Sequence, residues 1–312
     1  MTVSDRHLAL LAEHARLQLA RGDVHGAIES LRRALTEDPD DPILHALLAA
    51  TLLAARRRHA ARHEAERAVA LAPELPLAHR ALGYVRLSFR DLAGAAEGFE
   101  RAAELAPEDP DAHLALGRLH AAARRRGAAR AAFERALQLE PGELDAAVEL
   151  GELDLAEGKV ASARARALSV LAALAEHEGA LELMGRVLLA EGRADEAREH
   201  ALAILRQDAT SVAGVRLLCA AKARQSLLLG LWWRWNAFMS SLGDGRTVLV
   251  LVGLYVAQRL ALTALKDAGA LRAAGIVSWV WIAFALYTWV GPSVFARSVA
   301  KELRAVRLRP DF

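Results

Sequence analysis

Residues 76–109 read PLAHRALGYVRLSFRDLAGAAEGFERAAELAPED, and residues 110–143 read PDAHLALGRLHAAARRRGAARAAFERALQLEPGE. Both stretches begin with proline, carry Leu-Gly at their seventh and eighth positions, and are 34 residues long. Counting by 34 in both directions gives six successive units, at 8–41, 42–75, 76–109, 110–143, 144–177 and 178–211. A fixed period of this length predicts a stack of similar units in which each covers the apolar face of its neighbour.

Two columns of the repeat contain only small residues. Two helices approach closely only where both crossing points lack bulk, so these columns predict the contact between helix A and helix B of each unit. The twentieth position is Ala27, Ala61, Ala95, Ala129, Ala163 and Ala197, and the eighth is Ala15, Ala49, Gly83, Gly117, Gly151 and Gly185.

A third column marks the end of helix B. Position thirty-two is Pro39, Pro73, Pro107 and Pro141 in the first four units, where the missing N–H and fixed φ end a helix. Together these columns resemble the tetratricopeptide-repeat family over about residues 8 to 211. The resemblance implies an all-α solenoid, a superhelix of antiparallel hairpins, with a partial or capping helix at 212–225.

The resemblance also implies a groove lined by A helices that binds protein segments. In that geometry the inward-facing candidates are Arg80, Tyr84, Leu87, Leu114, Arg118, Glu152, Glu182 and Arg186. This mixture suits a partner with apolar and charged anchors, but a solvated helix face would look the same. The family's carboxylate clamp uses asparagine on A helices, and the only asparagine here is Asn236, outside the repeats.

Three histidines recur at the fourth position, at His45, His79 and His113. Equivalent positions in a solenoid are one repeat apart, too far to share an ion, so we interpret them as packing residues and expect no metal. Lone Cys219 cannot form an intrachain disulfide. No phosphate-binding loop or nucleophile elbow is visible, so we expect neither an enzyme nor a cofactor.

The turns from helix A to helix B are basic in every unit, whereas the loops from helix B to helix A are acidic. Cations near the C-terminus of a helix and anions near the N-terminus interact favourably with the helix dipole. This local effect explains both the basic edge, formed by the A-to-B turns, and the acidic edge, formed by the B-to-A loops. The alternative hypothesis is that the basic edge binds an acidic partner or lipid headgroups. Its candidate residues are Arg56, Arg57, Arg58, Arg90, Arg124, Arg125 and Arg126.

The C-terminal part has a different composition. Residues 1–225 hold 30 basic and 34 acidic residues, while 226–312 hold 10 and 4, so the repeats are not expected to bind nucleic acid. Residues 226–242 predict a tryptophan-rich amphipathic helix that either lies at a membrane interface, through Trp232, Trp233 and Trp235, or caps the solenoid. Residues 246–266 and 274–296 predict a two-helix transmembrane hairpin. Arg259 in the first span either snorkels outward or faces a bundle interior or membrane partner.

The charges that flank this hairpin predict its orientation. The outer flanks hold seven Lys and Arg, against two in the 266–272 connection, which places the repeats and the basic tail 297–312 in the cytoplasm of a bacterial cell. Charges near the N-terminus predict no signal peptide. The sequence thus predicts an integral membrane scaffold that binds protein partners and the lipid bilayer. The alternative is a subunit or assembly factor of a membrane transport or secretion complex.

Overall fold

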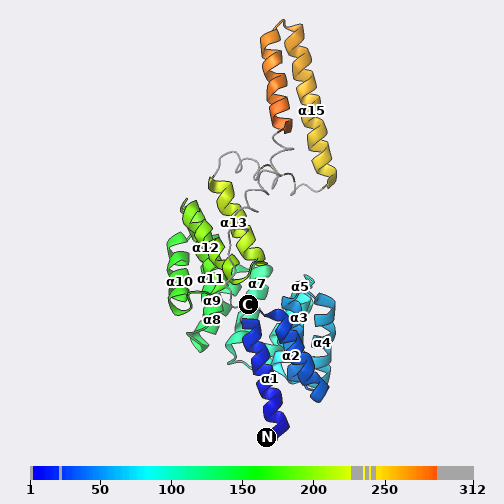
Figure 1. Cartoon of the computed structure of the whole chain (residues 1–312), viewed down its shortest axis with the longest axis vertical. Coiled ribbons are helices and arrows are strands. Elements are labelled where there is room, and N and C mark those ends of the chain that lie inside the picture. The colour runs from blue at the N-terminus through cyan, green and yellow to red at the C-terminus, as the bar shows by residue number, and fades with distance from the viewer. Residues whose placement is uncertain (1–2, 21–22, 226–234, 236–238, 240–243, 287–312) are drawn as a thin grey trace. The chain divides into compact units, whose positions relative to one another are not determined.

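The computed structural model describes residues 3–20, 23–225, 235, 239 and 244–286. The chain divides into two compact units, Met1–Val170 and Leu171–Phe312. The first contains α1 to α9 and most of α10, arranged as successive antiparallel pairs (Figure 1). These helices are α1 (Val3–Ala20), α2 (Val24–Glu37), α3 (Pro42–Ala54), α4 (Arg58–Leu71), α5 (Pro76–Ser88), α6 (Leu92–Leu105), α7 (Pro110–Ala122), α8 (Arg126–Leu139), α9 (Leu144–Ala156) and α10 (Val160–Ala173).

The helix boundaries follow from local chemistry. Pro42, Pro76 and Pro110 occupy the first turns of α3, α5 and α7, where a missing N–H costs nothing. The Asp41 carboxylate accepts hydrogen bonds from the N–H groups of Ile43 and Leu44, which caps α3. Helix starts from α3 to α9 therefore recur every 34 residues.

Small residues let the two helices of a unit approach. A Cβ atom on Gly83 would lie 2.5 Å from the ring of Phe99, so the glycine of α5 makes room for the aromatic side chain of α6. Gly117 has the same relation to Phe133 one unit later, and both rings are fully buried. All six alanines of the twentieth column are likewise fully buried, at 0% exposure. The all-helical repeat solenoid predicted from these columns is confirmed.

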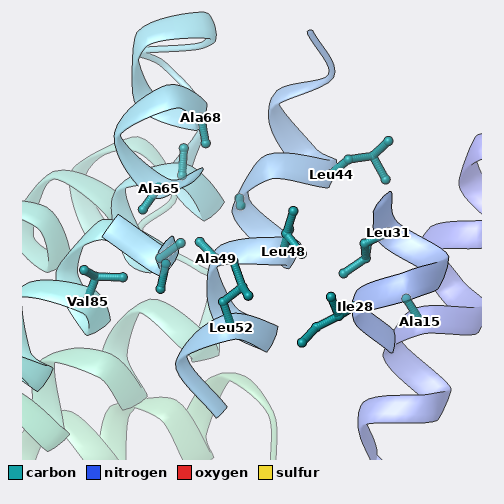
Figure 2. Close-up of a cluster of buried hydrophobic side chains, with 14 of the residues drawn as sticks. Ala15, Ile28, Leu31, Leu44, Leu48, Ala49, Leu52, Ala65, Ala68 and Val85 are labelled. Carbon is teal, nitrogen blue, oxygen red and sulfur yellow. The ribbon is translucent and has the colours of Figure 1, made fainter. Parts of the chain in front are cut away.

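Each repeat also packs on the next. Figure 2 shows Ile28 and Leu31 of α2 facing Leu48 and Leu52 of α3, with Val85 of α5 continuing the same apolar cluster. Burial of such side chains contributes about 1.5–3 kcal/mol each and is the main force that joins one hairpin to its neighbour.

The second compact unit begins with α11 (Glu178–Ala190), α12 (Ala194–Gln207) and α13 (Val212–Gln225). Helix α13 packs against both α11 and α12. Gly185 of α11 makes room for the Leu217 side chain of α13, so this small residue serves the contact with the next A-type helix, whereas Gly83 and Gly117 serve contacts within their own hairpins.

The same unit contains α15 (Asp244–Asp267), and residues 271–286 form a helix antiparallel to it (Figure 1). Gly269, with φ of 72°, lies in the tight turn between them. Among the described residues, no helix combines the length and the apolar character needed to cross a bilayer. The polar pair Gln258 and Arg259 interrupts α15, and residues 287–296 of the second predicted span lie outside the described residues. The predicted two-helix transmembrane hairpin is therefore not supported by the described residues.

Candidate protein-binding site

The A helices of three successive units carry a chain of ion pairs that crosses from each repeat to the next. Arg80 of α5 lies 2.8 Å from Asp109, just before α7, and 2.8 Å from Asp111 in α7. Arg118 of α7 lies 2.9 Å from Asp145 and 2.7 Å from Glu149, both in α9. We call this surface of α5, α7 and α9 the A-helix face.

Tyr84 of α5 contacts Arg118 of α7, in the next repeat. Its hydroxyl oxygen accepts a hydrogen bond from Arg118, 3.5 Å away, and its ring packs edge-to-face against Phe99 with centroids 4.9 Å apart. Burial raises the pKa of Tyr84, so the phenol stays neutral at physiological pH. Burial opposes the charge of Arg118, but the carboxylates of Glu149 and Asp145 outweigh it and raise the Arg118 pKa. Arg118 is thus a permanent cation held in one position.

The A-helix face carries more negative charge than positive. Four carboxylates, from Asp109, Asp111, Asp145 and Glu149, surround two guanidinium groups. The side chains of Asp111 and Asp145 remain 50% and 44% exposed despite their ion pairs. The surface can therefore attract cationic groups of a partner while its own arginines keep the carboxylates in place.

The structure places the other predicted groove residues in three different environments. Leu114 is only 4% exposed and packs in the core with Phe133 and Leu150, so its prediction as a groove residue is wrong. Leu87 is half-buried against the Phe99 cluster, and Glu152 of α9 is half-buried.

Glu182 and Arg186 lie on α11, in the second compact unit. Glu182 forms an ion pair with Arg216 of α13, exactly one repeat period further along the chain. Arg186 is exposed. The A helices of the second unit therefore repeat the cross-repeat pairing of acid and base.

The basic edge consists of Arg56, Arg57, Arg58, Arg90, Arg124, Arg125 and Arg126, in the turns that join α3 to α4, α5 to α6 and α7 to α8. All seven side chains are exposed. Arg58 donates a hydrogen bond to the Ser88 carbonyl at 3.2 Å. Within the described residues, none of the seven has a carboxylate within ion-pairing distance.

The backbone of the basic edge is unusual. Arg56, Arg90 and Arg124 have φ values of 59°, 62° and 59°, in the left-handed region that side chains disfavour. The equivalent residues of the two following units are Gly158 and Gly192, which adopt this region without a steric cost.

The histidine column has a structural explanation. A ring nitrogen of His45, His79 and His113 lies 2.9, 2.7 and 2.8 Å from the carbonyl oxygen of the proline six residues earlier, Pro39, Pro73 and Pro107. Each histidine therefore fixes the loop that enters its own helix. Among the residues that the structure describes, no three His, Cys, Asp or Glu side chains are grouped so that they could hold a metal ion.

A buried carboxylate network that the sequence did not reveal joins the fourth and fifth repeats. The Asp154 side chain is 2% exposed and accepts hydrogen bonds from Ser162 at 2.6 Å, Arg130 at 2.7 Å and Arg166 at 3.0 Å. Burial disfavours its charge, but these three donors outweigh burial and lower the pKa of Asp154 to about 2.

The predicted interfacial tryptophans are only partly covered by the structure. Trp232 and Trp233 lie outside the described residues. Trp235 packs edge-to-face against Phe284 of the 271–286 helix, with ring centroids 5.2 Å apart.

The fold defines a helical-repeat protein, in which equivalent positions of successive units form surfaces that extend over several repeats. Models described as tetratricopeptide repeat match residues 18–83, 80–143 and 148–212, together more than half of the chain. The chain therefore belongs to the tetratricopeptide-repeat family, and the sequence-based prediction of the family is confirmed. Such repeats mediate protein–protein interaction. The comparison with curated proteins gave no match.

Solved structures share the fold at low sequence identity. A tetratricopeptide repeat protein from Parabacteroides merdae has a TM-score of 0.57 and 17% identity, with 69% of this chain and 84% of that chain covered. For the Cut9–Hcn1 hetero-tetramer of APC/C the TM-score is 0.54 and the identity 18%, with 70% of this chain and 43% of that chain covered. For PilW the TM-score is 0.50 and the identity 20%, with 68% of this chain and 98% of that chain covered.

Proposed function

We propose that this chain is a non-enzymatic scaffold that binds a protein partner through the A-helix face of α5, α7 and α9. One observation carries the proposal: a chain of arginine–carboxylate pairs runs across three repeats and contains four carboxylates for two guanidinium groups. Ion pairs that already hold these side chains reduce the entropy lost when a partner binds.

The partner segment we propose has cationic and apolar side chains. The half-exposed carboxylates of Asp111 and Asp145 favour lysine or arginine, and the half-buried side chains of Tyr84 and Leu87 offer apolar contact. Electrostatic complementarity of this kind contributes to specificity and association rate more than to affinity.

Charge-neutralising substitutions test this proposal directly. The probe is a fluorescein-labelled peptide of alternating Lys and Leu, titrated with the full chain in a non-ionic detergent. Asp111→Asn with Asp145→Asn should weaken binding about three- to tenfold, because each exposed charge pair contributes about 0.2–1 kcal/mol. The matched control is Glu66→Gln with Glu100→Gln, which removes two exposed charges from B helices. Equal weakening in both variants would show that only net charge matters and would refute the site.

We also propose that the C-terminal helices attach the scaffold to a membrane, with the repeats on the cytoplasmic side. The support is the large exposed apolar surface of α15 and residues 271–286, which includes Leu249, Leu260, Leu271 and Trp279, each at least 66% exposed. Apolar patches of this kind are uncommon on surfaces that face water. Alkaline carbonate extraction of cell membranes tests the proposal, since release of the intact chain into the supernatant would contradict it.

A second candidate is a subunit or assembly factor of a membrane transport or secretion complex. The fold similarity to PilW, described as a type IV pilus biogenesis factor, is what favours it. Purification from gently solubilised membranes separates the two proposals. A stoichiometric set of integral membrane proteins supports the subunit, whereas variable soluble partners support the scaffold.

A further inference from the structure

We infer that the basic edge of the second, third and fourth repeats is a docking strip for an extended acidic segment of another protein. The strip comprises the seven arginines already defined, and it lies at the A-to-B turns rather than on the A-helix face. It does not depend on the proposed function of that face.

The first observation is how differently the arginines of this unit are paired. Arg67, Arg80, Arg101, Arg118 and Arg130 each lie within 3.2 Å of a carboxylate. The strip arginines are exposed, and within the part of the chain that the structure places they have no such carboxylate. Among the described residues, Arg32, Arg62 and Arg135 of the B helices also lack such a carboxylate, but only the strip gathers uncompensated cations in successive A-to-B turns, where they attract an acidic partner.

The second observation is backbone strain at equivalent positions. Arg56, Arg90 and Arg124 occupy the left-handed region, where Gly158 and Gly192 stand in the following repeats. Glycine would be the residue with the least steric cost at this position. Three successive repeats instead carry an exposed cation there, so the side chain has a use that is separate from the turn itself.

The third observation is that carboxylates lie beside and within the strip. The preceding A-to-B turn carries Asp23, which caps α2, and Arg21, which lies outside the described residues. In the following turn Lys159 lies 2.7 Å from Glu157. Asp91 also lies inside the row, where its carboxylate caps α6. A bilayer would meet all these carboxylates within about one Debye length of the cations, so a narrow acidic segment fits the row better than an anionic membrane does.

The spacing of the strip suggests the conformation of the partner. Helix α5 contacts both α3 and α7, and packed helices lie about 8–10 Å apart. Cations at successive turns therefore repeat at about that distance. A polyproline II segment places every third side chain on one face, about 9 Å apart. Acidic residues at every third position would then face Arg56, Arg90 and Arg124 in turn.

The test measures binding of a fluorescein-labelled (Glu-Pro-Pro)4 peptide to the full chain in a non-ionic detergent, at 150 mM salt. The strip variant is Arg56→Gly with Arg90→Gly and Arg124→Gly. It should weaken binding about tenfold, since each exposed ion pair contributes up to a few-fold. Its melting temperature should be retained or raised, because glycine relieves the left-handed strain.

The matched control removes the same charge elsewhere. The control variant combines Arg32→Gln, Arg33→Gln and Arg135→Gln, at exposed positions of the B helices α2 and α8. It should change the peptide affinity less than twofold. If the control variant bound the peptide as weakly as the strip variant does, the inference would be overturned. A strip variant whose melting temperature lies several degrees below that of the unmodified chain would also overturn it. In the latter case the arginines would serve the helix ends.

Two further outcomes would also overturn the inference. Salt-sensitive self-association that the strip variant abolishes would identify a second copy of this chain as the occupant. Loss of binding to phosphatidylglycerol vesicles without loss of peptide binding would identify a membrane. Because the A-helix face is unchanged in the strip variant, binding of the Lys and Leu peptide should be preserved.

Discussion

Replacement of Asp154 by asparagine should loosen the contact between the fourth and fifth repeats. The substitution keeps the shape of the side chain but removes the charge that Arg130 and Arg166 approach at 2.7 and 3.0 Å. Arg166 would then face a neutral amide, whereas Arg130 would keep, of the described carboxylates, only Glu157, 3.1 Å away, as a partner.

The pKa of Asp154 gives the size of the effect. Its folded value is about 2, against 3.8 for the ordinary carboxyl, and each unit corresponds to 1.36 kcal/mol. The ionised group thus stabilises the folded state by about 2 kcal/mol. This stabilisation is fully present above the unfolded pKa and is lost as the pH falls from about 4 through 2. The asparagine variant should therefore lose about 2 kcal/mol at pH 7 and little at pH 2.

Hydrogen exchange read by mass spectrometry suits a repeat protein, whose units can open locally. Peptides from α9 and α10 should exchange roughly 30-fold faster in the variant at pH 7. Peptides from α3 and α4 should be unchanged. Glu100→Gln, at an exposed site, is the control and should alter exchange less than about twofold. Unchanged exchange in α9 and α10 would refute the role assigned to this network.

Two further substitutions probe the repeat itself. Gly83→Ala should lower the free energy of unfolding by about 1–3 kcal/mol, because the new Cβ atom would meet the Phe99 ring at 2.5 Å. Gly127→Ala is the control and should not lower the free energy of unfolding, because the space around Gly127 is open. Thermal melts compare the pair, and equal melting temperatures would contradict the packing argument. His113→Ala removes the hydrogen bond to the Pro107 carbonyl and should cost about 0.5–1.5 kcal/mol by urea unfolding. A neutral result would mean that the ring merely fills space.

Much of the fold could be predicted from the sequence, because the close-approach sites are local and periodic. The small size of Gly83 and Ala95, and the recurrence of small residues at their positions every 34 residues, were enough to predict the contact of two helices. The burial of Phe99 over Gly83 then follows from the space that the glycine leaves.

The binding surfaces could be predicted only in part. Arg80 and Arg118 were identified as facing inward, but their partners in the next repeat were missed. A signal was present, since the paired acids follow 27 to 31 residues later, close to one period. Leu114 was misplaced because the family's positional rule ignores which neighbouring helix covers the side chain.

The Asp154 network could not be found from the sequence. Ser162 and Arg166 follow it by 8 and 12 residues, and Arg130 precedes it by 24, so no single helical spacing relates them. Only the turn between α9 and α10 and the packing of α8 bring these side chains together. The left-handed arginines were hidden for a similar reason, because the sequence of a turn does not state its φ angle.

Photo-crosslinking in cells tests the central proposal most directly. A photoreactive phenylalanine at position 84 replaces one aromatic side chain of the A-helix face with another, and the same residue at His63 labels the outer surface of α4. We predict a discrete protein adduct from position 84 that is absent from position 63 and is lost when Asp111 and Asp145 are neutralised. Identical adducts from both positions, or none from position 84, would contradict binding at the A-helix face.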